Sequence, residues 1–164
     1  MLTLFCVTAL IGALCGLSAC KATGQGPDCA DLVKACSAVA DEGTFDIWAS
    51  YGEDLYKDSF RNMYGVQYDM LEDGAILYTQ EGGKADEISV MKLKKAEDVS
   101  LAKEKLSERI GERRHLFEGY KPEEVSKLEN AYVFSQGNYV VLLISEKNQK
   151  FETEIRTAIS EGVK

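Results

Sequence analysis

Histidine, proline and tryptophan are scarce in this chain: its 164 residues include one histidine, two prolines and one tryptophan. The histidine, His115, lies in the segment ERRHLF, whose charged neighbours are typical of a solvated helix face. No GxSxG nucleophile elbow, glycine-rich phosphate loop or EF-hand spacing occurs in the chain. We therefore expect no catalytic residue, cofactor or metal site, and we do not expect the protein to be an enzyme.

Cysteine is present, with five residues, but no CxxC pair occurs, which argues against a zinc site. Cys29 and Cys36 fall with Leu32 and Val39 on one face of a predicted helix. Seven helical residues separate two Cα atoms by about 10.5 Å, too far for a disulfide. The main interpretation is two small buried apolar side chains. A disulfide that bends this segment and a reactive thiol, for instance Cys36 paired with His115, are the alternatives.

Charge is absent from the first twenty residues and strongly negative after them, with a formal net charge of −8. No basic stripe interleaved with aromatic residues occurs. Such an acidic chain has no electrostatic attraction to the phosphate backbone of nucleic acid. We therefore expect no nucleic-acid partner.

The N-terminal stretch LFCVTALIGALCGLSACKATGQG carries no charge before Lys21 and has the layout of a secretory signal, although a basic n-region is missing. Its residues LSAC match the lipobox of bacterial lipoproteins, whereas GALC, ending at Cys15, fits poorly. By this resemblance residues 1–19 are a lipoprotein signal peptide, and Cys20 receives a diacylglyceryl group, with fatty acyl chains such as palmitate, and becomes the new N-terminus. Two acyl chains give stable anchoring. Residues 20–27 are then a tether that holds the protein at the extracytoplasmic side of the cell membrane. An uncleaved membrane anchor is the alternative.

Residues 28–164 are predicted to form a single α+β domain. Its antiparallel sheet consists of two hairpins, about four strands in all, with helices packed mainly on one face. One hairpin pairs 76–79 with 87–93 around Gly82 and Gly83, and the other turns at 137–138. We expect one face of 87–93 to be only partly buried. Helices are predicted over 28–43, capped by Asp28, over 53–65, after Asp98 and over 149–159, with a short helical turn after Pro122.

The helix after Asp98 contains an anomaly, because Arg113 falls on its apolar stripe of Val99, Ala102, Leu106, Ile110 and Phe117. We predict either a charge-assisted contact between Arg113 and Glu87 or ordinary snorkelling of the arginine stem. Adjacent strand residues point to opposite faces, so Asp86 and Glu87 cannot act together as acid and base. Lys105 with Glu108 and Arg109 with Glu112 are predicted as solvent-side pairs. The candidate binding residues are Asp86, Glu87, Arg113, Tyr120 and Tyr139.

Several segments together resemble a bacterial lipoprotein family known as domain of unknown function 4358. They are Tyr64-Gly65, ADEISVMKLK at 85–94, YKPEEVSKLENAYV at 120–133 and GNYVVLLIS at 137–145. The resemblance implies a lipoprotein of the cell envelope with no assigned catalysis, and it provides no catalytic residues to transfer. The main functional prediction is a lipid-anchored, non-catalytic binding or scaffold domain with an envelope protein partner. The alternatives are an accessory or sensory subunit of a membrane complex, and an enzyme with an unrecognised carboxylate or thiol site.

Overall fold

The computed structural model describes residues 26–80 and 83–162 of the chain. The predicted signal peptide, Cys20 and Gly82 of the predicted turn lie outside these residues. The elements, in chain order, are α1 (Cys29–Val39), β1 (Ile47–Ser50), α2 (Asp54–Met63), β2 (Leu71–Tyr78), β3 (Glu87–Leu93), α3 (Val99–Tyr120), α4 (Val125–Glu129), β4 (Tyr132–Gln136), β5 (Tyr139–Ile144) and α5 (Asn148–Gly162).

The sheet has five strands in the order β1-β2-β3-β5-β4, and every neighbouring pair is antiparallel. Both predicted hairpins are present, and β3 and β5 join them in the centre of the sheet. The expectation of four strands was wrong, because the edge strand β1 adds a fifth. This strand has only four residues, too few to show a clear alternation of apolar and polar side chains. Strand β2 also begins earlier than predicted, at Leu71.

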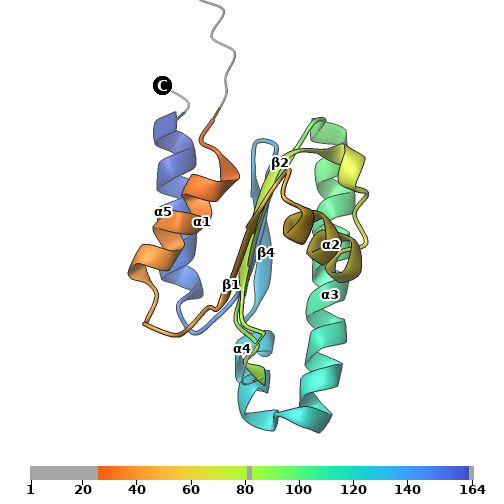
Figure 1. Ribbon diagram of the computed structural model, residues 1–164, viewed down its shortest axis with the longest axis vertical. Coiled ribbons are helices and arrows are strands. Elements are labelled where there is room, and N and C mark those ends of the chain that lie inside the picture. The colour runs from red at the N-terminus through yellow and green to blue at the C-terminus, as the bar shows by residue number, and fades with distance from the viewer. Residues whose placement is uncertain (1–25, 81–82, 163–164) are drawn as a thin grey trace, which may run out of the picture.

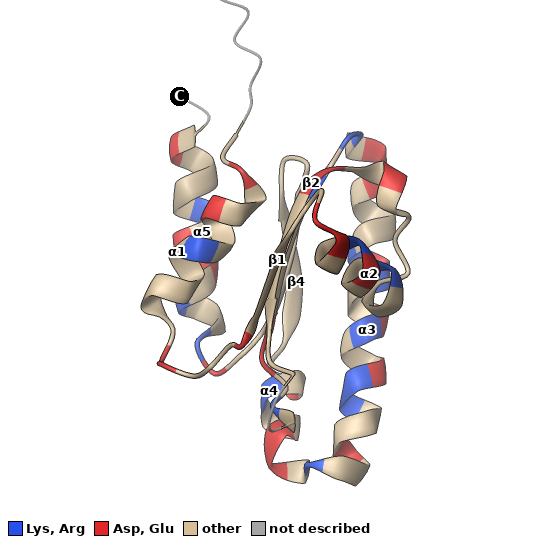
Figure 2. Ribbon diagram, in the orientation of Figure 1, with Lys and Arg blue, Asp and Glu red and all other residues tan. Residues whose placement is uncertain are grey.

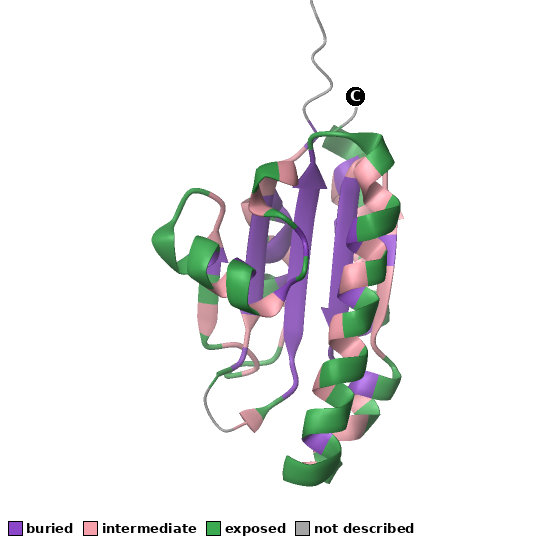
Figure 3. Cartoon of the chain, turned by 90° about the vertical axis from the view of Figure 1, so that its right-hand side faces the viewer, coloured by how far each residue is buried: buried purple, intermediate pink, exposed green. Residues whose placement is uncertain are grey.

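Helices cover both faces of the sheet, with α1 and α5 on one side and α2 and α3 on the other (Figure 1). The expectation of helices mainly on one face was therefore wrong. Two apolar clusters result, one on each side. All residues of β3 and β5 are buried, including the face of 87–93 that was expected to be only partly buried. Figure 3 shows these buried central strands behind α3, whose outer surface is exposed. Strands covered on both faces carry near-continuous apolar sequence, as Tyr139–Ile144 does.

The helix boundaries differ from the predicted caps in detail. Asp28 and Asp98 occupy the N-cap positions of α1 and α3, but neither side chain makes a capping hydrogen bond. The Cys29 amide instead donates to Oδ2 of Asp73 on β2, at 2.7 Å. Helix α1 ends at Val39, before Gly43. Because a side chain from another element satisfies the first amide of α1, the local sequence could not identify the partner.

Cys29 and Cys36 are free and fully buried, as the main interpretation predicted. Both lie on the face of α1 that packs against the sheet and α5. Burial raises the pKa of the Cys36 thiol to about 12. A thiol with this pKa is a poor nucleophile at neutral pH. Because both thiols are free in the structure, the disulfide alternative is wrong for these two residues.

We expect the buried Cys36 thiol to make the protein less stable at alkaline pH. Above about pH 9 the unfolded chain releases this proton while the folded protein retains it, so the free energy of unfolding falls as pH rises. One such proton gives a slope of about 1.4 kcal/mol per pH unit. Urea unfolding across this range should therefore show a shallower slope in Cys36→Ala than in the wild type. Parallel pH profiles would contradict the expectation.

Candidate functional site

The most extensive polar cluster of the described residues surrounds Glu87, which is fully buried at the start of β3. Its Oε1 accepts hydrogen bonds from the Tyr64 hydroxyl and from Arg109 Nε, each at 2.7 Å. Its Oε2 accepts from Arg109 Nη2 at 2.6 Å and from Arg113 Nη1 at 3.0 Å. Arg109 Nη1 also donates to the Met63 carbonyl at the end of α2. One carboxylate thus connects the sheet, α2 and α3.

The charge state of Glu87 follows from these contacts. Burial alone would raise the pKa of its carboxyl group, but Arg109 and Arg113 lower it below the ordinary value. The same contacts with Glu87 raise the pKa of Arg109 despite its burial. Glu87 is therefore ionised at neutral pH, and its four hydrogen bonds occupy both oxygens. Such a carboxylate is poorly suited to act as a general base.

Arg113 pairs with the Glu87 carboxylate and also contacts the backbone of Ala85 and the ring of Phe117. Its Nη2 donates to the Ala85 carbonyl at 3.1 Å, and its guanidinium lies 5.3 Å from the centre of the Phe117 ring. The side chain is 15% exposed, so the stem does not carry the charge out to solvent. The predicted contact between Arg113 and Glu87 is confirmed, and simple snorkelling is not what the structure shows.

The residue before Glu87 forms a second cluster on the other side of the strand. Asp86 Oδ2 accepts from Lys127 Nζ of α4 at 2.7 Å, and Lys127 also contacts Glu124 at 2.9 Å. The same Glu124 carboxylate accepts the Ala85 amide at 2.8 Å. Burial lowers the pKa of Lys127, but the hydrogen bonds to Asp86 and Glu124 raise it above its ordinary value. Asp86 and Glu87 thus bind different cations, in agreement with the prediction that the two carboxylates do not act together as acid and base.

We call these residues the β3 charge network. They are Asp86, Glu87, Arg109, Arg113, Glu124 and Lys127. Three carboxylates face three cations, so the formal charge of the network is zero. The charged positions along α3, from which the two arginines come, are visible in Figure 2. Charges that are paired and hydrogen-bonded in this way are the form in which a fold tolerates them away from water.

The structure brings together three of the five predicted site residues, namely Asp86, Glu87 and Arg113. Tyr120 lies at the exposed C-terminal end of α3, 64% exposed, with its ring against Phe117. Tyr139 lies at the start of β5 and donates its hydroxyl proton to the Pro27 carbonyl at 2.7 Å. Neither tyrosine contacts the network through any described hydrogen bond.

Arg109 was predicted incorrectly, because its spacing to Glu112 assigned it to the solvent side of α3. It lies one helical turn before Arg113, so the two guanidiniums share a face, and this spacing was the signal available in the sequence. Lys105 does pair with Glu108, at 2.7 Å, as predicted. Tyr64 and Lys127 were not predicted as site residues, because neither has a local pattern that distinguishes it from other tyrosines and lysines.

The alternative of a Cys36–His115 pair is wrong. Cys36 lies in α1 and His115 in α3, on opposite sides of the sheet (Figure 1). The His115 side chain is 92% exposed and lies 3.7 Å from Glu118. The sheet prevents contact between the thiol and the imidazole.

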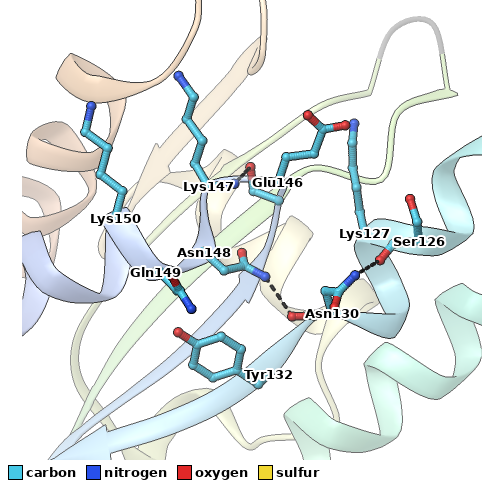
Figure 4. Close-up of a pocket in the computed structure, with 10 residues that line it drawn as sticks. Ser126, Lys127, Asn130, Tyr132, Glu146, Lys147, Asn148, Gln149 and Lys150 are labelled. Carbon is cyan, nitrogen blue, oxygen red and sulfur yellow. Dashed lines mark hydrogen bonds between the residues drawn. The ribbon is translucent and has the colours of Figure 1, made fainter.

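A polar groove adjoins the network at the end of the sheet where β5 ends and α5 begins. We call it the α4–α5 groove, and its volume is about 620 Å³. A smaller pocket of about 110 Å³ beside it shares Lys127 and also contains Asp86. Figure 4 shows the groove residues, which come from α4 and the residue after it, from β4, from the connection of β5 to α5, and from the first turn of α5. They are Ser126, Lys127, Asn130, Tyr132, Ser145, Glu146, Lys147, Asn148, Gln149 and Lys150.

Neither a metal-binding cluster nor a membrane-spanning helix is found in residues 26–80 and 83–162. No three histidine, cysteine, aspartate or glutamate side chains there are grouped so as to hold a metal ion. Within the same residues, no helix has the length and apolar character needed to cross a membrane.

The architecture is that of an α+β protein with an antiparallel sheet between two layers of helices. Residues 52–145 match the profile of a family described as domain of unknown function, DUF4358. The match covers more than half of the chain, and the chain belongs to this family. Residues of both the network and the groove fall within the matched range. No curated protein and no solved structure matches the chain.

Proposed function

We propose that this protein is a lipid-anchored binding domain of the cell envelope, held by Cys20 at the outer face of the membrane. Its role is to bind or support a partner rather than to catalyse a reaction. The α4–α5 groove is its binding site.

The observation that carries the proposal is the position of the groove relative to the start of the domain. Pro27 contacts Tyr139, the first residue of β5, whereas Ser145 of the groove follows its last residue. Six residues of strand span about 20 Å. The described chain therefore begins at one end of the sheet, and the first turn of α5, which lines the groove, lies at the other end (Figure 1). With a lipid on Cys20, the groove would face away from the bilayer.

The β3 charge network supports a non-catalytic role. Its carboxylates and cations are bound to one another, and Glu87 has no exposed surface. The network holds α3 and α4 on the sheet and thereby shapes the wall of the groove that Lys127 contributes. Its function is then to position the binding surface.

Substitution of Cys20 tests the anchor. We expect Cys20→Ala to abolish metabolic labelling with palmitate, because the thioether needs this thiol, and to move the protein from the membrane fraction to the soluble fraction. Cys15→Ala is the matched control, because the residue lies in the same leader but its surroundings fit the lipobox poorly; it should label and fractionate like the wild type. If Cys20→Ala keeps both its label and its membrane association, the proposed anchor is wrong.

A further inference from the structure

The α4–α5 groove combines a helix N-terminus with an excess of positive charge. Its ten lining residues include three lysines and one glutamate, in a protein whose formal net charge is −8. Helix α5 is fifteen residues long and has no acidic residue in its first turn. Lys147 precedes that turn and Lys150 lies in it, where a cation is repelled by the helix dipole. An anion at this position would remove the repulsion.

The backbone of the first turn of α5 is also suited to an anion. The amides of Lys150 and Phe151 donate to the Lys147 carbonyl. The amides of Asn148 and Gln149 precede these bonds and have no acceptor within the helix. Amides in this position, together with the dipole, make a helix N-terminus favourable for phosphate.

A second, independent feature of the groove is a buried acceptor without a donor. Asn148 is only 6% exposed, and its Nδ2 donates to the Asn130 carbonyl at 2.9 Å. Its Oδ1 has no hydrogen-bond partner among the described residues. Figure 4 shows this amide between the α5 turn and Asn130, with Lys147 and Lys150 extending in one direction beside it. Because a buried acceptor without a donor costs free energy, this amide favours a ligand that carries a donor group.

The cations of the groove differ in their availability. Lys127 is held by Asp86 and Glu124. Lys147 contacts Asp41, but the Asp41 side chain is 77% exposed, and pairs of this kind are weak. Lys150 is exposed and has no described ion-pair partner. Lys150 is therefore the cation that a ligand meets first.

We infer that the groove binds a phosphate ester of a polyol or a sugar. The phosphate lies at the first turn of α5, against the amides of Asn148 and Gln149 and the ammonium group of Lys150. A hydroxyl group of the ligand, which can both donate and accept, donates to Asn148 Oδ1. The inference rests on the proposed binding role of the groove, and it adds the chemical class of the ligand.

The test is an NMR titration of the full chain in polyoxyethylene detergent micelles with sn-glycerol 3-phosphate. We expect the amide signals of Asn148 and Gln149 and the side-chain amide of Asn148 to shift. Lys150→Gln should weaken binding about tenfold through loss of a charge-assisted contact. Asn148→Asp should abolish binding, because its carboxylate repels phosphate; since it also loses the Nδ2 donor to the Asn130 carbonyl, its amide spectrum without ligand serves as the check that it is folded. Lys57→Gln, an exposed lysine of α2 on the other side of the sheet, should leave binding unchanged.

Two further probes separate the parts of the ligand. Glycerol alone should not bind, and inorganic phosphate should bind more weakly than the ester. Equal affinity for phosphate and ester would overturn the role of the hydroxyl group. Nanodiscs with and without phosphatidylglycerol identify the source of the ester: shifts that need only this lipid indicate a membrane headgroup, and shifts that need the added ester indicate a soluble one.

The inference as a whole is overturned if no signal of the first α5 turn shifts with the ester. It is equally overturned if Lys150→Gln and Lys57→Gln bind the ester alike. The palmitate label on Cys20 is measured separately, so failure of the ligand class is distinguishable from failure of the anchor.

Discussion

Replacement of Glu87 by glutamine is expected to destabilise the protein by about 3–5 kcal/mol, the cost of removing one partner from a buried ion pair. Glutamine preserves the volume of the side chain but removes the charge that Arg109 and Arg113 share. Both guanidiniums are then left without their counter-charge, at 12% and 15% exposure. The measurement is the free energy of unfolding in urea at neutral pH. Glu118→Gln, at a half-exposed carboxylate of α3, should change it by less than about 0.5 kcal/mol.

The pH dependence of the stability lost in Glu87→Gln distinguishes the loss of ion pairs from a packing defect. Because the folded protein lowers the pKa of Glu87, the unfolded chain takes up this proton first as pH falls. The stabilisation by Glu87 is thus complete above about pH 4.3 and declines at lower pH. The stability difference between wild type and Glu87→Gln should shrink correspondingly on acidification. A difference that is constant from pH 7 down to pH 3 would show that the ion pairs are not its source.

The two arginines should not be equivalent. In Arg113→Met, Glu87 is still bound by Arg109 and Tyr64, and its negative charge is balanced by the positive charge of Arg109. We therefore expect a smaller loss of stability, about 1–3 kcal/mol. Arg109→Met removes two hydrogen bonds to Glu87 and one to the Met63 carbonyl, and it should cost more. Unchanged stability in Arg113→Met would mean that this contact contributes nothing.

The predictions that the structure confirms rest on local sequence patterns, whereas those that it corrects depend on tertiary packing. Helical spacing identified the apolar face of α3 and the anomaly at Arg113, and strand periodicity paired 76–79 with 87–93. Which side of the sheet a helix covers is a tertiary property, and no local pattern contains it. For this reason the second helical layer was missed, and one face of 87–93 was expected to be only partly buried.

The same limit explains the assignment of Arg109. A nearby acidic residue, Glu112, offered a local partner, and an i,i+3 pair is a sufficient explanation when only the helix is considered. The buried carboxylate of Glu87 is a stronger partner, because a bidentate contact away from water gains more than an exposed pair. The sequence alone does not say that β3 brings this carboxylate beneath α3.

Gly74 of β2 is the position where we expect the largest effect from adding a single methyl group. A Cβ atom there would lie 2.0 Å from the hydroxyl oxygen and 2.7 Å from Cζ of Tyr56, a fully buried residue of α2. The strand and the helix are packed on each other, so neither can move without disturbing the aromatic cluster around Tyr56 and Phe60. Gly74→Ala is therefore expected to destabilise the protein by about 2–3 kcal/mol through overpacking. Gly111→Ala is the matched control: apart from the adjacent backbone of α3, no atom lies within 4 Å of its Cβ, and it should stabilise by about 0.5–1 kcal/mol.

A double-mutant cycle with Tyr56→Phe tests whether the clash is the cause. The Tyr56 hydroxyl has no hydrogen-bond partner among residues 26–80 and 83–162, so its removal alone should change stability little. In the Gly74→Ala background the same removal takes away the nearest clashing atom and should recover part of the lost stability. The recovery is incomplete because Cζ of residue 56 remains close to the added methyl group. The expected coupling is at least about 1 kcal/mol between the two positions. Additive effects would show that the strand accommodates alanine by another movement, and that contact with the Tyr56 hydroxyl does not determine how closely α2 approaches β2.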